Sequence, residues 1–254
     1  MTARLEGGCL VTRLDTTGAV PDGTLRAVPI IGRDTGARAI SLRALEFAPG
    51  LSPGLRNETC DEVLYVLSGH ATVWLDGRPH AIEAETGLYL EPGRCLTLDN
   101  PGPDPVVMVS SRCPEPDRHA ATCPALTRPD PSSPSPATVP FVRLWDRAPK
   151  TTADRWYRLL VDREAGCTQV TQFVGSIPPG RAPDHYHEYE EVLCVLQGEG
   201  RMWAGKTTAP VTAGSCIYLP RRQVHCVENT GRAELRLLGV FYPAGSPAVR
   251  YDPD

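Results

Sequence analysis

The chain has 254 residues and a formal net charge of -4, which argues against a nucleic-acid partner, because nucleic-acid-binding proteins present basic patches. Its first fifteen residues, MTARLEGGCLVTRLD, lack the apolar core of a signal peptide, and no window approaches the roughly eighteen apolar residues of a membrane span. The nine cysteines are scattered without a CxxC pair, so neither a disulfide framework nor a structural zinc cluster is indicated. We therefore expect a cytoplasmic protein without a nucleic-acid or membrane partner.

Short apolar or alternating runs follow one another along the chain, separated by Gly, Pro, Asn or Asp, which is typical of strands joined by turns. In the first half these runs are EVLYVLSG from Glu62, ATVWLDG from Ala71 and GLYLEPG from Gly87. In the second half they are EVLCVLQG from Glu191, GSCIYLP from Gly214 and LRLLGVFYP from Leu235. No long amphipathic helix competes, and TTADRWYRLLVD from Thr151 is interpreted as a strand. The sequence therefore predicts an all-β fold.

The middle of the chain has a different composition. From Cys113 to Pro140 it reads CPEPDRHAATCPALTRPDPSSPSPATVP, where proline, serine and small residues replace apolar periodicity. Such a composition is typical of a stiff, extended connector. We therefore predict a first domain over 1–113, a linker over 114–140 and a second domain over 141–254.

The two halves resemble each other in sequence. When Glu62 is laid over Glu191 without a gap, further identical residues align at the same offset. The pairs include Trp74 with Trp203, Tyr89 with Tyr218, and Asn100 with Asn229. Repeated matches at one offset indicate an internal duplication. Many short strands in each half predict a small closed barrel, because closure removes exposed strand edges.

Metal-ligating residue types gather in the second half, in DHYHEYEEVLCVLQGEG. Side chains two residues apart share one face of a strand, so His185 and His187 point the same way, and Glu191 rejoins that face after a turn or bulge. In GSCIYLPRRQVHCVENTG a turn at Pro220 leads to a strand that opens with His225. Three imidazoles and one carboxylate bind a divalent transition metal and leave two octahedral positions open.

These motifs resemble those of the cupin superfamily. The first cupin motif is matched by Gly180, His185, His187, Glu191 and Gly198, with its opening gap one residue short. The second is matched by Gly214, Pro220, His225 and Asn229, while Arg222 stands where the family has glycine. The resemblance implies a bicupin whose second barrel binds one metal ion through His185, His187, Glu191 and His225. Fe or Mn is the favoured ion, with Zn, Ni, Co and Cu as alternatives.

The first half lacks the imidazoles. At the same offset, the three histidines align with Arg56, Glu58 and Leu96, and Glu191 aligns with Glu62. An arginine and a leucine argue against a transition-metal site there. We expect Arg56, Glu58 and Glu62 to form a buried ion-pair cluster or to hold a polar ligand, with a structural role for this barrel.

Five further residues are candidates for the surroundings of the metal. Tyr218 is a candidate catalytic residue whose hydroxyl would donate to a bound oxygen, with a core position as the alternative. Arg201, Trp203 and Arg222 are candidate anchors for an anionic substrate, because guanidinium binds carboxylate in a bidentate manner. Each of these three is also consistent with a surface position, and alternation places Gln223 on the face of His225.

The resemblance implies an enzyme acting on a small polar or anionic substrate, as a monomer or homodimer. Oxygen-dependent chemistry of the dioxygenase type is the leading hypothesis, since the ligand set is similar to those of quercetin dioxygenases, acireductone dioxygenases and oxalate decarboxylases. Redox-neutral isomerisation, decarboxylation or hydrolysis is the alternative, as in ureidoglycine aminohydrolases, although their ligand order differs. A non-catalytic binder of small molecules is the third hypothesis.

Overall fold

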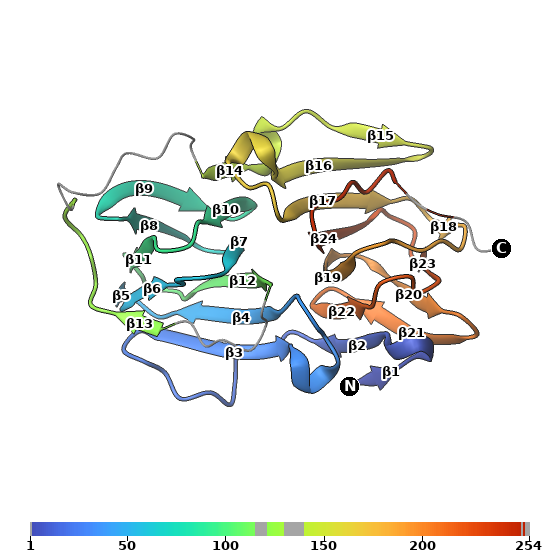
Figure 1. Cartoon of the computed structure of the whole chain (residues 1–254), viewed down its shortest axis with the longest axis horizontal. Coiled ribbons are helices and arrows are strands. Elements are labelled where there is room, and N and C mark those ends of the chain that lie inside the picture. The colour runs from blue at the N-terminus through green and yellow to red at the C-terminus, as the bar shows by residue number, and fades with distance from the viewer. Residues whose placement is uncertain (1, 115–120, 130–139, 250, 252–254) are drawn as a thin grey trace.

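The computed structural model describes residues 2–114, 121–129, 140–249 and 251, and these residues form little besides β-strands (Figure 1). Four single turns of 3-10 helix interrupt them, namely η1 (Glu6–Gly8), η2 (Arg33–Thr35), η3 (Leu144–Asp146) and η4 (Arg163–Ala165). No described helix has the length and apolar character needed to span a bilayer. The predicted all-β fold is confirmed.

The first barrel consists of two facing sheets. One contains, in spatial order, β14 (Phe141–Arg143), β10 (Thr86–Leu90), β7 (Asp61–Ser68), β12 (Val106–Cys113), β4 (Leu42–Phe47) and β3 (Leu25–Ile31). The other contains β13 (Ala121–Cys123), β6 (Gly54–Arg56), β11 (Cys95–Asn100), β8 (His70–Leu75) and β9 (Arg78–Glu83), with β5 (Gly50–Leu51) beside β11.

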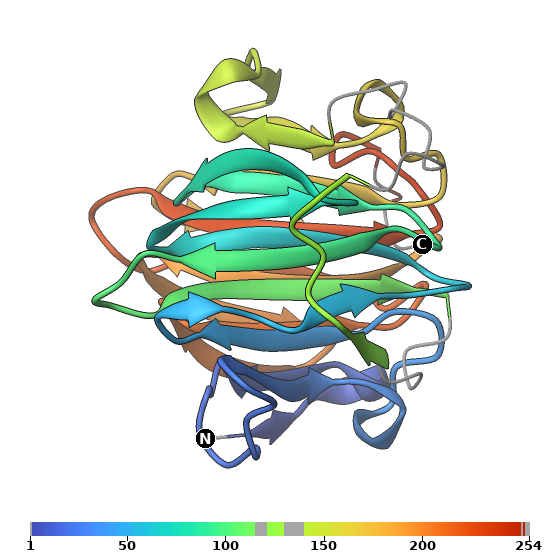
Figure 2. The ribbon, with the colours of Figure 1, turned by 90° about the vertical axis from the view of Figure 1, so that its left-hand side faces the viewer.

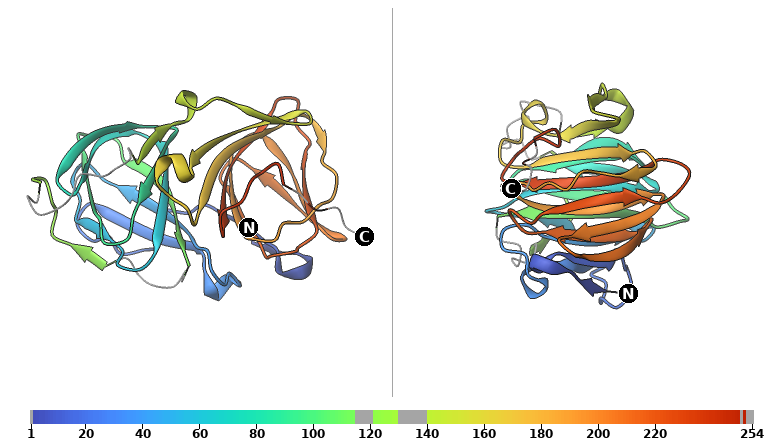
Figure 3. Two further views of the ribbon diagram at one scale, coloured as in Figure 1. Left: turned by 45° about the horizontal axis from the view of Figure 1, so that its top comes forward. Right: turned by 90° about the vertical axis from the view of Figure 1, so that its right-hand side faces the viewer.

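The second barrel also consists of two facing sheets. Its inner sheet, which is the sheet that packs against the first barrel, is the larger of the two. That sheet contains β1 (Ala3–Arg4), β2 (Leu10–Arg13), β22 (Ser215–Leu219), β19 (Glu190–Gln197), β24 (Leu235–Tyr242), β17 (Thr171–Ile177), β16 (Arg155–Val161) and β15 (Lys150–Thr152). The outer sheet contains β18 (Gly180–Arg181), β23 (His225–Asn229), β20 (Glu199–Ala204) and β21 (Thr207–Thr212). The two barrels lie side by side, so the strands of one lie behind those of the other when viewed from either end (Figures 2 and 3).

Alternation along the inner strands divides the apolar residues among three cores. On β19, Leu193 and Val195 fill the second barrel, while Val192 and Cys194 face the first barrel. On β7, the residues aligned with Val192 and Cys194 take part in the same inter-barrel core. The two inner sheets are therefore packed face to face, and the strands at their centre read as continuous apolar runs because both faces are buried.

The two barrels exchange edge strands. Strand β2 pairs with β22, placing Leu10 opposite Tyr218, and β14 pairs with β10, placing Phe141 opposite Leu88. The predicted domain boundaries are corrected accordingly, because residues 3–13 extend a sheet of the second barrel and residues 141–143 extend a sheet of the first. Each exchange covers a sheet edge that would otherwise be exposed.

The predicted linker is only partly a connector. Its residues 121–123 form β13, which pairs with β6 of the first barrel. The thiol sulfur of Cys123 lies 3.3 Å from that of Cys95, which belongs to β11 on the other side of β6. Residues 115–120 and 130–139 of the linker lie outside the described part of the chain.

Candidate metal centre

His185 and His225 are brought together by backbone pairing. Each donates its backbone N–H to the carbonyl oxygen of the other, at 3.0 and 2.8 Å, and this bridge joins the segment after β18 to the first residue of β23. Directly opposed residues of an antiparallel pair carry their side chains on the same face. The two imidazole rings consequently lie with their centroids 4.5 Å apart.

His187 is held by the turn that precedes β23. The backbone N–H of Arg222 donates to the carbonyl oxygen of His187 at 2.7 Å. Arg222 adopts a φ of 62°, the left-handed conformation, and Gly93 adopts a φ of 82° at the matching turn of the first barrel. The turn therefore keeps its shape although arginine replaces glycine, and this substitution carries the strain of a side chain at positive φ.

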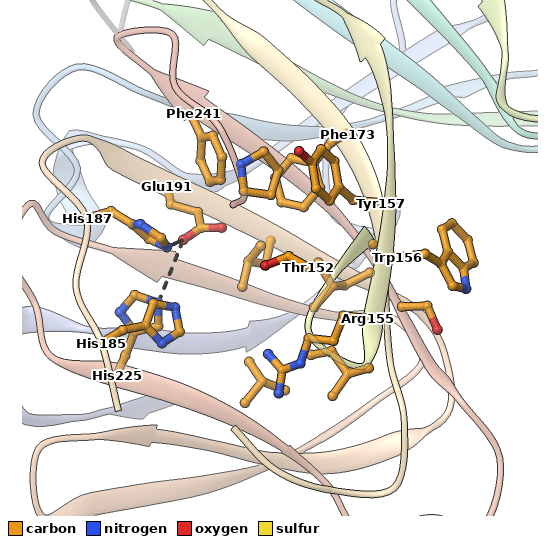
Figure 4. A pocket seen from close by; sticks show the side chains of 17 residues that line it. Thr152, Arg155, Trp156, Tyr157, Phe173, His185, His187, Glu191, His225 and Phe241 are labelled. Atoms are coloured by element: carbon orange, nitrogen blue, oxygen red, sulfur yellow. Dashed lines mark ion pairs between the residues drawn. The ribbon is translucent and has the colours of Figure 1, made fainter. Parts of the chain in front are cut away.

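Glu191 reaches the histidines from the opposite sheet, on β19. Its Oε2 lies 4.0 Å from Nε2 of His187 and 3.9 Å from Nε2 of His225 (Figure 4). One potential ligand atom from each of the three histidines also falls within 4.8 Å of the others. Donor atoms around an ion with bonds of about 2.1 Å lie about 3 Å apart, so a small inward adjustment brings these side chains to bonding distance.

Burial sets the charge state of these groups. Together with the positive charge of His185, the smaller cause, it lowers the pKa of His187 to about 4 and that of His225 to about 3. Burial alone raises the pKa of Glu191 to about 8. The two imidazoles are therefore neutral at pH 7, as metal ligands must be, and the carboxylate is ionised there only at a cost that a neighbouring cation would remove.

Hydrogen bonds around the centre fix the orientation of the rings. Nδ1 of His185 lies 3.0 Å from the carbonyl oxygen of Pro183, and Nδ1 of His225 lies 2.7 Å from that of Gln223. When Nδ1–H donates to a carbonyl, Nε2 carries the lone pair that a metal requires. Tyr189 stacks on His187 with ring centroids 4.9 Å apart, and its hydroxyl lies 3.2 Å from Nδ1 of His187.

The donor set fits a divalent transition metal. Three imidazoles and a carboxylate suit Mn, Fe, Co, Ni, Cu or Zn. Oε2 of Glu191 is buried and accepts no hydrogen bond from the described residues. Buried polar atoms normally have a partner, and a bound cation would be a partner for this oxygen. His185, His187, Glu191 and His225 are thus positioned to hold one ion.

A cavity of about 100 Å³ adjoins these four side chains inside the second barrel. Its walls are mainly apolar and include Phe173, Ile177, Leu193, Val227, Leu237 and Phe241. Another side is closed by Thr152 of β15 and by Arg155, Trp156 and Tyr157 of β16, and Arg155 extends into the cavity opposite the histidines (Figure 4). The sequence-based prediction missed Arg155 and Tyr157, although their spacing of two residues places both on one face of the strand predicted there.

Tyr218 lies away from this cavity, so its predicted catalytic position is corrected. On β22, Ile217 and Leu219 point into the second barrel, and Tyr218 points toward the first. Its hydroxyl donates to Oε1 of Glu190 at 2.9 Å. The tyrosine is a core residue between the barrels because alternation turns it away from the ligands.

Arg201 and Trp203 also lie outside the cavity. On β20, Met202 and Ala204 are buried inside the barrel, which leaves Arg201 and Trp203 on the outer face. The indole N–H of Trp203 donates to Glu228 at 2.8 Å, and the guanidinium of Arg181 lies 4.3 Å from the centroid of the indole ring. Neither residue is placed to anchor a substrate at the metal.

The last two predicted substrate-binding residues belong to the turn before β23. Arg222 is exposed and forms an ion pair with Glu188 at 2.8 Å. The side-chain amide of Gln223 donates to the carbonyl of Val224 at 2.8 Å, and its oxygen fills the space beside Gly7. Gln223 does not share the face of His225 because β23 begins only at His225.

The first barrel has a different centre at the matching position. Glu62 is fully buried and accepts hydrogen bonds from Arg43, Asn57 and Ser110, while the guanidinium of Arg112 lies 3.9 Å from it. The predicted buried ion-pair cluster is present, but with other partners. Arg56 and Glu58 pair with each other on the surface at 2.8 Å.

Strand pairing also corrects the alignment of the two halves. Leu96 pairs with Leu55, as His225 pairs with His185. The backbone N–H of Gly93 donates to Asn57, as that of Arg222 donates to His187. Leu55 and Asn57 are therefore the counterparts of His185 and His187. One extra residue between Asn57 and Glu62 shifts the alignment from the gapless one, which pairs the histidines with Arg56 and Glu58.

Two tandem barrels, one of them with three histidines and a glutamate that could hold a metal ion, are the architecture of a bicupin. The chain belongs to the cupin family, since the sequence model of the Cupin domain matches residues 44–112 and 173–241. The two matched regions begin and end at the offset that separates Glu62 from Glu191. The duplication and the resemblance to cupins are thereby confirmed.

Two curated relatives are similar to part of the chain. Auxin-binding protein 1 of Arabidopsis thaliana is 32% identical over 86 residues, which cover 30% of this chain and 43% of that protein. The oxalate-binding protein of Thermotoga maritima is 32% identical over 85 residues, covering 32% of this chain and 70% of that protein. The first match thus spans less than half of the relative.

Solved structures resemble the whole fold. A glyoxylate-induced protein from Pseudomonas aeruginosa has a TM-score of 0.73 at 18% identity, covering 98% of this chain and 94% of that one. A variant of Bacillus subtilis oxalate decarboxylase has a TM-score of 0.72 at 15% identity, covering 91% of this chain and 76% of that one. At these identities the likeness extends to the fold alone.

Proposed function

We propose that this protein is a metal-dependent bicupin enzyme that acts on a small anionic metabolite. The observation that carries the proposal is the convergence of His185, His187, Glu191 and His225 on the wall of a small cavity inside the second barrel. Three imidazoles and one carboxylate would hold a single ion, with Fe or Mn favoured. The bound ion would supply Lewis-acid and redox chemistry at its two remaining coordination positions.

The cavity limits the size and the charge of the substrate. Its volume of about 100 Å³ is far below the roughly 300–1,000 Å³ of pockets for drug-sized ligands, so only a molecule of few heavy atoms fits. Arg155 supplies a guanidinium to the lining, and guanidinium binds carboxylate through two parallel hydrogen bonds. The names of two similar proteins, an oxalate-binding protein and an oxalate decarboxylase, support a small carboxylate as the substrate class.

Oxygen-dependent chemistry is our leading assignment within this class. Among the described residues that line the cavity, no carboxyl or imidazole group is present besides the four proposed ligands. Hydrolysis and isomerisation commonly require a side chain that accepts and donates protons. The chain itself would bind the substrate through Arg155, exclude water with Phe173 and Phe241, and hold the ligand rings through Pro183 and Tyr189.

The assignment is tested on protein purified without a histidine tag. Elemental analysis measures the bound metal, and an oxygen electrode follows turnover with small carboxylates, enediols and catechols. We expect Fe or Mn, with oxygen uptake that is absent in His187→Ala. Arg155→Gln should raise KM for anionic substrates, and the exposed Arg232→Gln should not. Protein that remains free of metal after loading would contradict the whole proposal.

A redox-neutral metalloenzyme is the second candidate, and Tyr157 in the cavity lining is the observation that favours it, since a tyrosine hydroxyl can transfer a proton. Zn content with substrate turnover and no oxygen uptake would select it.

A non-catalytic binder is the third candidate, favoured by the two relatives that are named binding proteins. Stoichiometric binding of a small anion without turnover would select that function.

We also propose a cellular location and an oligomeric state for the enzyme. All nine cysteines carry free thiols, which supports the reducing environment of the cytoplasm. The exchange of edge strands makes each chain a paired assembly of two barrels, so we propose a monomer, with a homodimer as the alternative. Size-exclusion chromatography with light scattering distinguishes the two.

A further inference from the structure

A second and larger cleft lies between the two barrels, apart from the metal cavity. It has a volume of about 590 Å³, and none of its lining residues lines the cavity beside the histidines. Three separate segments form its walls: the N-terminal segment with Arg4 and Gly8, the loop after η2 with Arg38, and the second barrel with Glu190, Tyr218 and Arg221. Ligand sites commonly occur at such boundaries between domains.

The lining of this cleft carries an excess of positive charge. Arg4, Arg38 and Arg221 are exposed and face it from the three different segments. In the described part of the chain, no carboxylate lies within 4.0 Å of these three guanidinium groups. Guanidinium groups that are not neutralised by the protein raise the local concentration of anions and bind phosphate or carboxylate in a bidentate manner.

The one acidic residue of the lining is already occupied. Glu190 is buried and accepts the backbone N–H groups of Arg38 and Ala39, at 3.1 and 2.8 Å, and the hydroxyl of Tyr218. These bonds tie the η2 loop of the first barrel to β19 of the second. The carboxylate thus binds the backbone of the cleft wall, and the side chain of Arg38 takes no part in these bonds.

The duplicated structure provides an internal control for this charge. Loop η4 of the second barrel repeats loop η2, since Gly166 donates to Arg163 as Gly36 donates to Arg33. In that repeat Thr168 takes the place of Arg38, and in the turn after β10 Pro92 takes the place of Arg221. The fold therefore does not require arginine at either position, and the basic cluster occurs on one side only.

We infer that this inter-barrel cleft binds a small organic anion with at least two negative charges, such as a phosphorylated metabolite or a polycarboxylate. Three guanidinium groups from three segments match a ligand with several anionic groups, and the cleft volume exceeds what a bare inorganic ion needs. Arg221 directly precedes Arg222, whose backbone N–H holds His187. The cleft therefore adjoins the turn that supports the metal centre.

Isothermal titration calorimetry on the metal-loaded full chain tests this inference, with pyrophosphate and citrate as the two probes. The titrations are done at about 150 mM salt, because surface charges are then screened beyond about 8 Å. The test variant is Arg38→Gln combined with Arg221→Gln, and the matched control is Arg232→Gln, an exposed arginine on the loop before β24. Because both probes chelate metals, His187→Ala is titrated in parallel. The tighter probe distinguishes a phosphate ligand from a carboxylate ligand.

We expect saturable binding of one probe per chain, weakened by at least about tenfold in the double variant because two charge-assisted contacts are lost. Binding should be unchanged in Arg232→Gln and retained in His187→Ala. Absence of binding by both probes, or equal affinity in the double variant and the control, would overturn the inference. Loss of binding in His187→Ala would also overturn it, since the probe would then occupy the metal centre.

Discussion

The two barrels place a glutamate at the same position and surround it in opposite ways. Glu62 pairs across strands with Arg112, and Glu191 pairs in the same register with Phe241. Ser110 pairs with Arg43 in the first barrel, whereas Gly239 pairs with Phe173 in the second. Arg43 and Arg112 therefore lie around the carboxylate of Glu62, whereas Phe173 and Phe241 lie around that of Glu191.

This difference explains why, among the described residues, a group of side chains suited to a metal ion occurs in the second barrel and not in the first. Burying a charge is costly unless a counter-charge or hydrogen bonds compensate for it. Arg43, Arg112 and Asn57 provide that compensation to Glu62 within the protein. Glu191 lies beside neutral imidazoles and aromatic rings instead, so a bound cation is the compensation that its environment leaves open.

The largest effect is expected from removing one imidazole. His187→Ala should abolish stoichiometric metal binding, because three remaining ligands and a cavity hold a divalent ion far more weakly. Glu58→Ala, on the surface of the other barrel, should leave the metal content unchanged. Elemental analysis after metal loading and gel filtration measures both variants, and equal metal content in the two would contradict the comparison.

The two glutamates should differ sharply in their contribution to stability. Glu62→Gln should lower the free energy of unfolding by about 3–5 kcal/mol, because it leaves Arg43 and Arg112 buried without a counter-charge. Glu191→Gln should leave the metal-free protein at pH 7 as stable or more so, since burial raises the pKa of Glu191 to about 8 and ionising it in the folded state opposes folding.

Urea denaturation of both variants without metal measures this difference. An equal loss of stability in Glu62→Gln and Glu191→Gln would show that the two carboxylates have equivalent surroundings. The metal content of the two variants should differ in the opposite way. Glu191→Gln should lose metal, and Glu62→Gln should retain it.

A smaller effect is expected from the residue that orients His187. Tyr189→Phe removes the hydroxyl beside Nδ1 of His187 and should weaken metal affinity by about tenfold, the lower end for residues that support ligands. Tyr186→Phe is the matched control, because its ring packs on Tyr251 instead. Competition with a chromogenic chelator measures both. An unchanged affinity in Tyr189→Phe would exclude this orienting role.

The smallest effect should be the same in both barrels. Tyr89 donates its hydroxyl to Asp61 at 2.5 Å, and Tyr218 donates to Glu190 at 2.9 Å. Tyr89→Phe and Tyr218→Phe should each lower the free energy of unfolding by about 1–2 kcal/mol, the cost of one hydrogen bond to a charged group. Tyr218→Phe should not change turnover. A large loss of turnover would restore the catalytic role that the structure does not support.

Spacing in the sequence was sufficient for the fold class and for the four candidate ligands. The period of two along a strand places His185 and His187 together, and the turn at Pro220 aligns His225 with them. These are local relations, and the backbone bridge between His185 and His225 realises them directly.

Relations between distant strands were not predictable in the same way. Alternation shows that Tyr218 and Leu219 face opposite sides, but not which side faces the metal. Arg155 reaches the cavity because the β15–β16 hairpin closes it, and Arg43 reaches Glu62 across β12. Such contacts depend on strand order and register, which a single sequence does not specify.

Anomalous diffraction from crystals grown with metal, collected above and below the absorption edge of the bound ion, tests the central claim most directly. We predict one strong anomalous peak per chain, within bonding distance of His185, His187, Glu191 and His225, and none near Glu62. A peak among Arg43, Glu62 and Arg112, or no peak in the second barrel of a fully loaded crystal, would contradict the assignment of the metal centre.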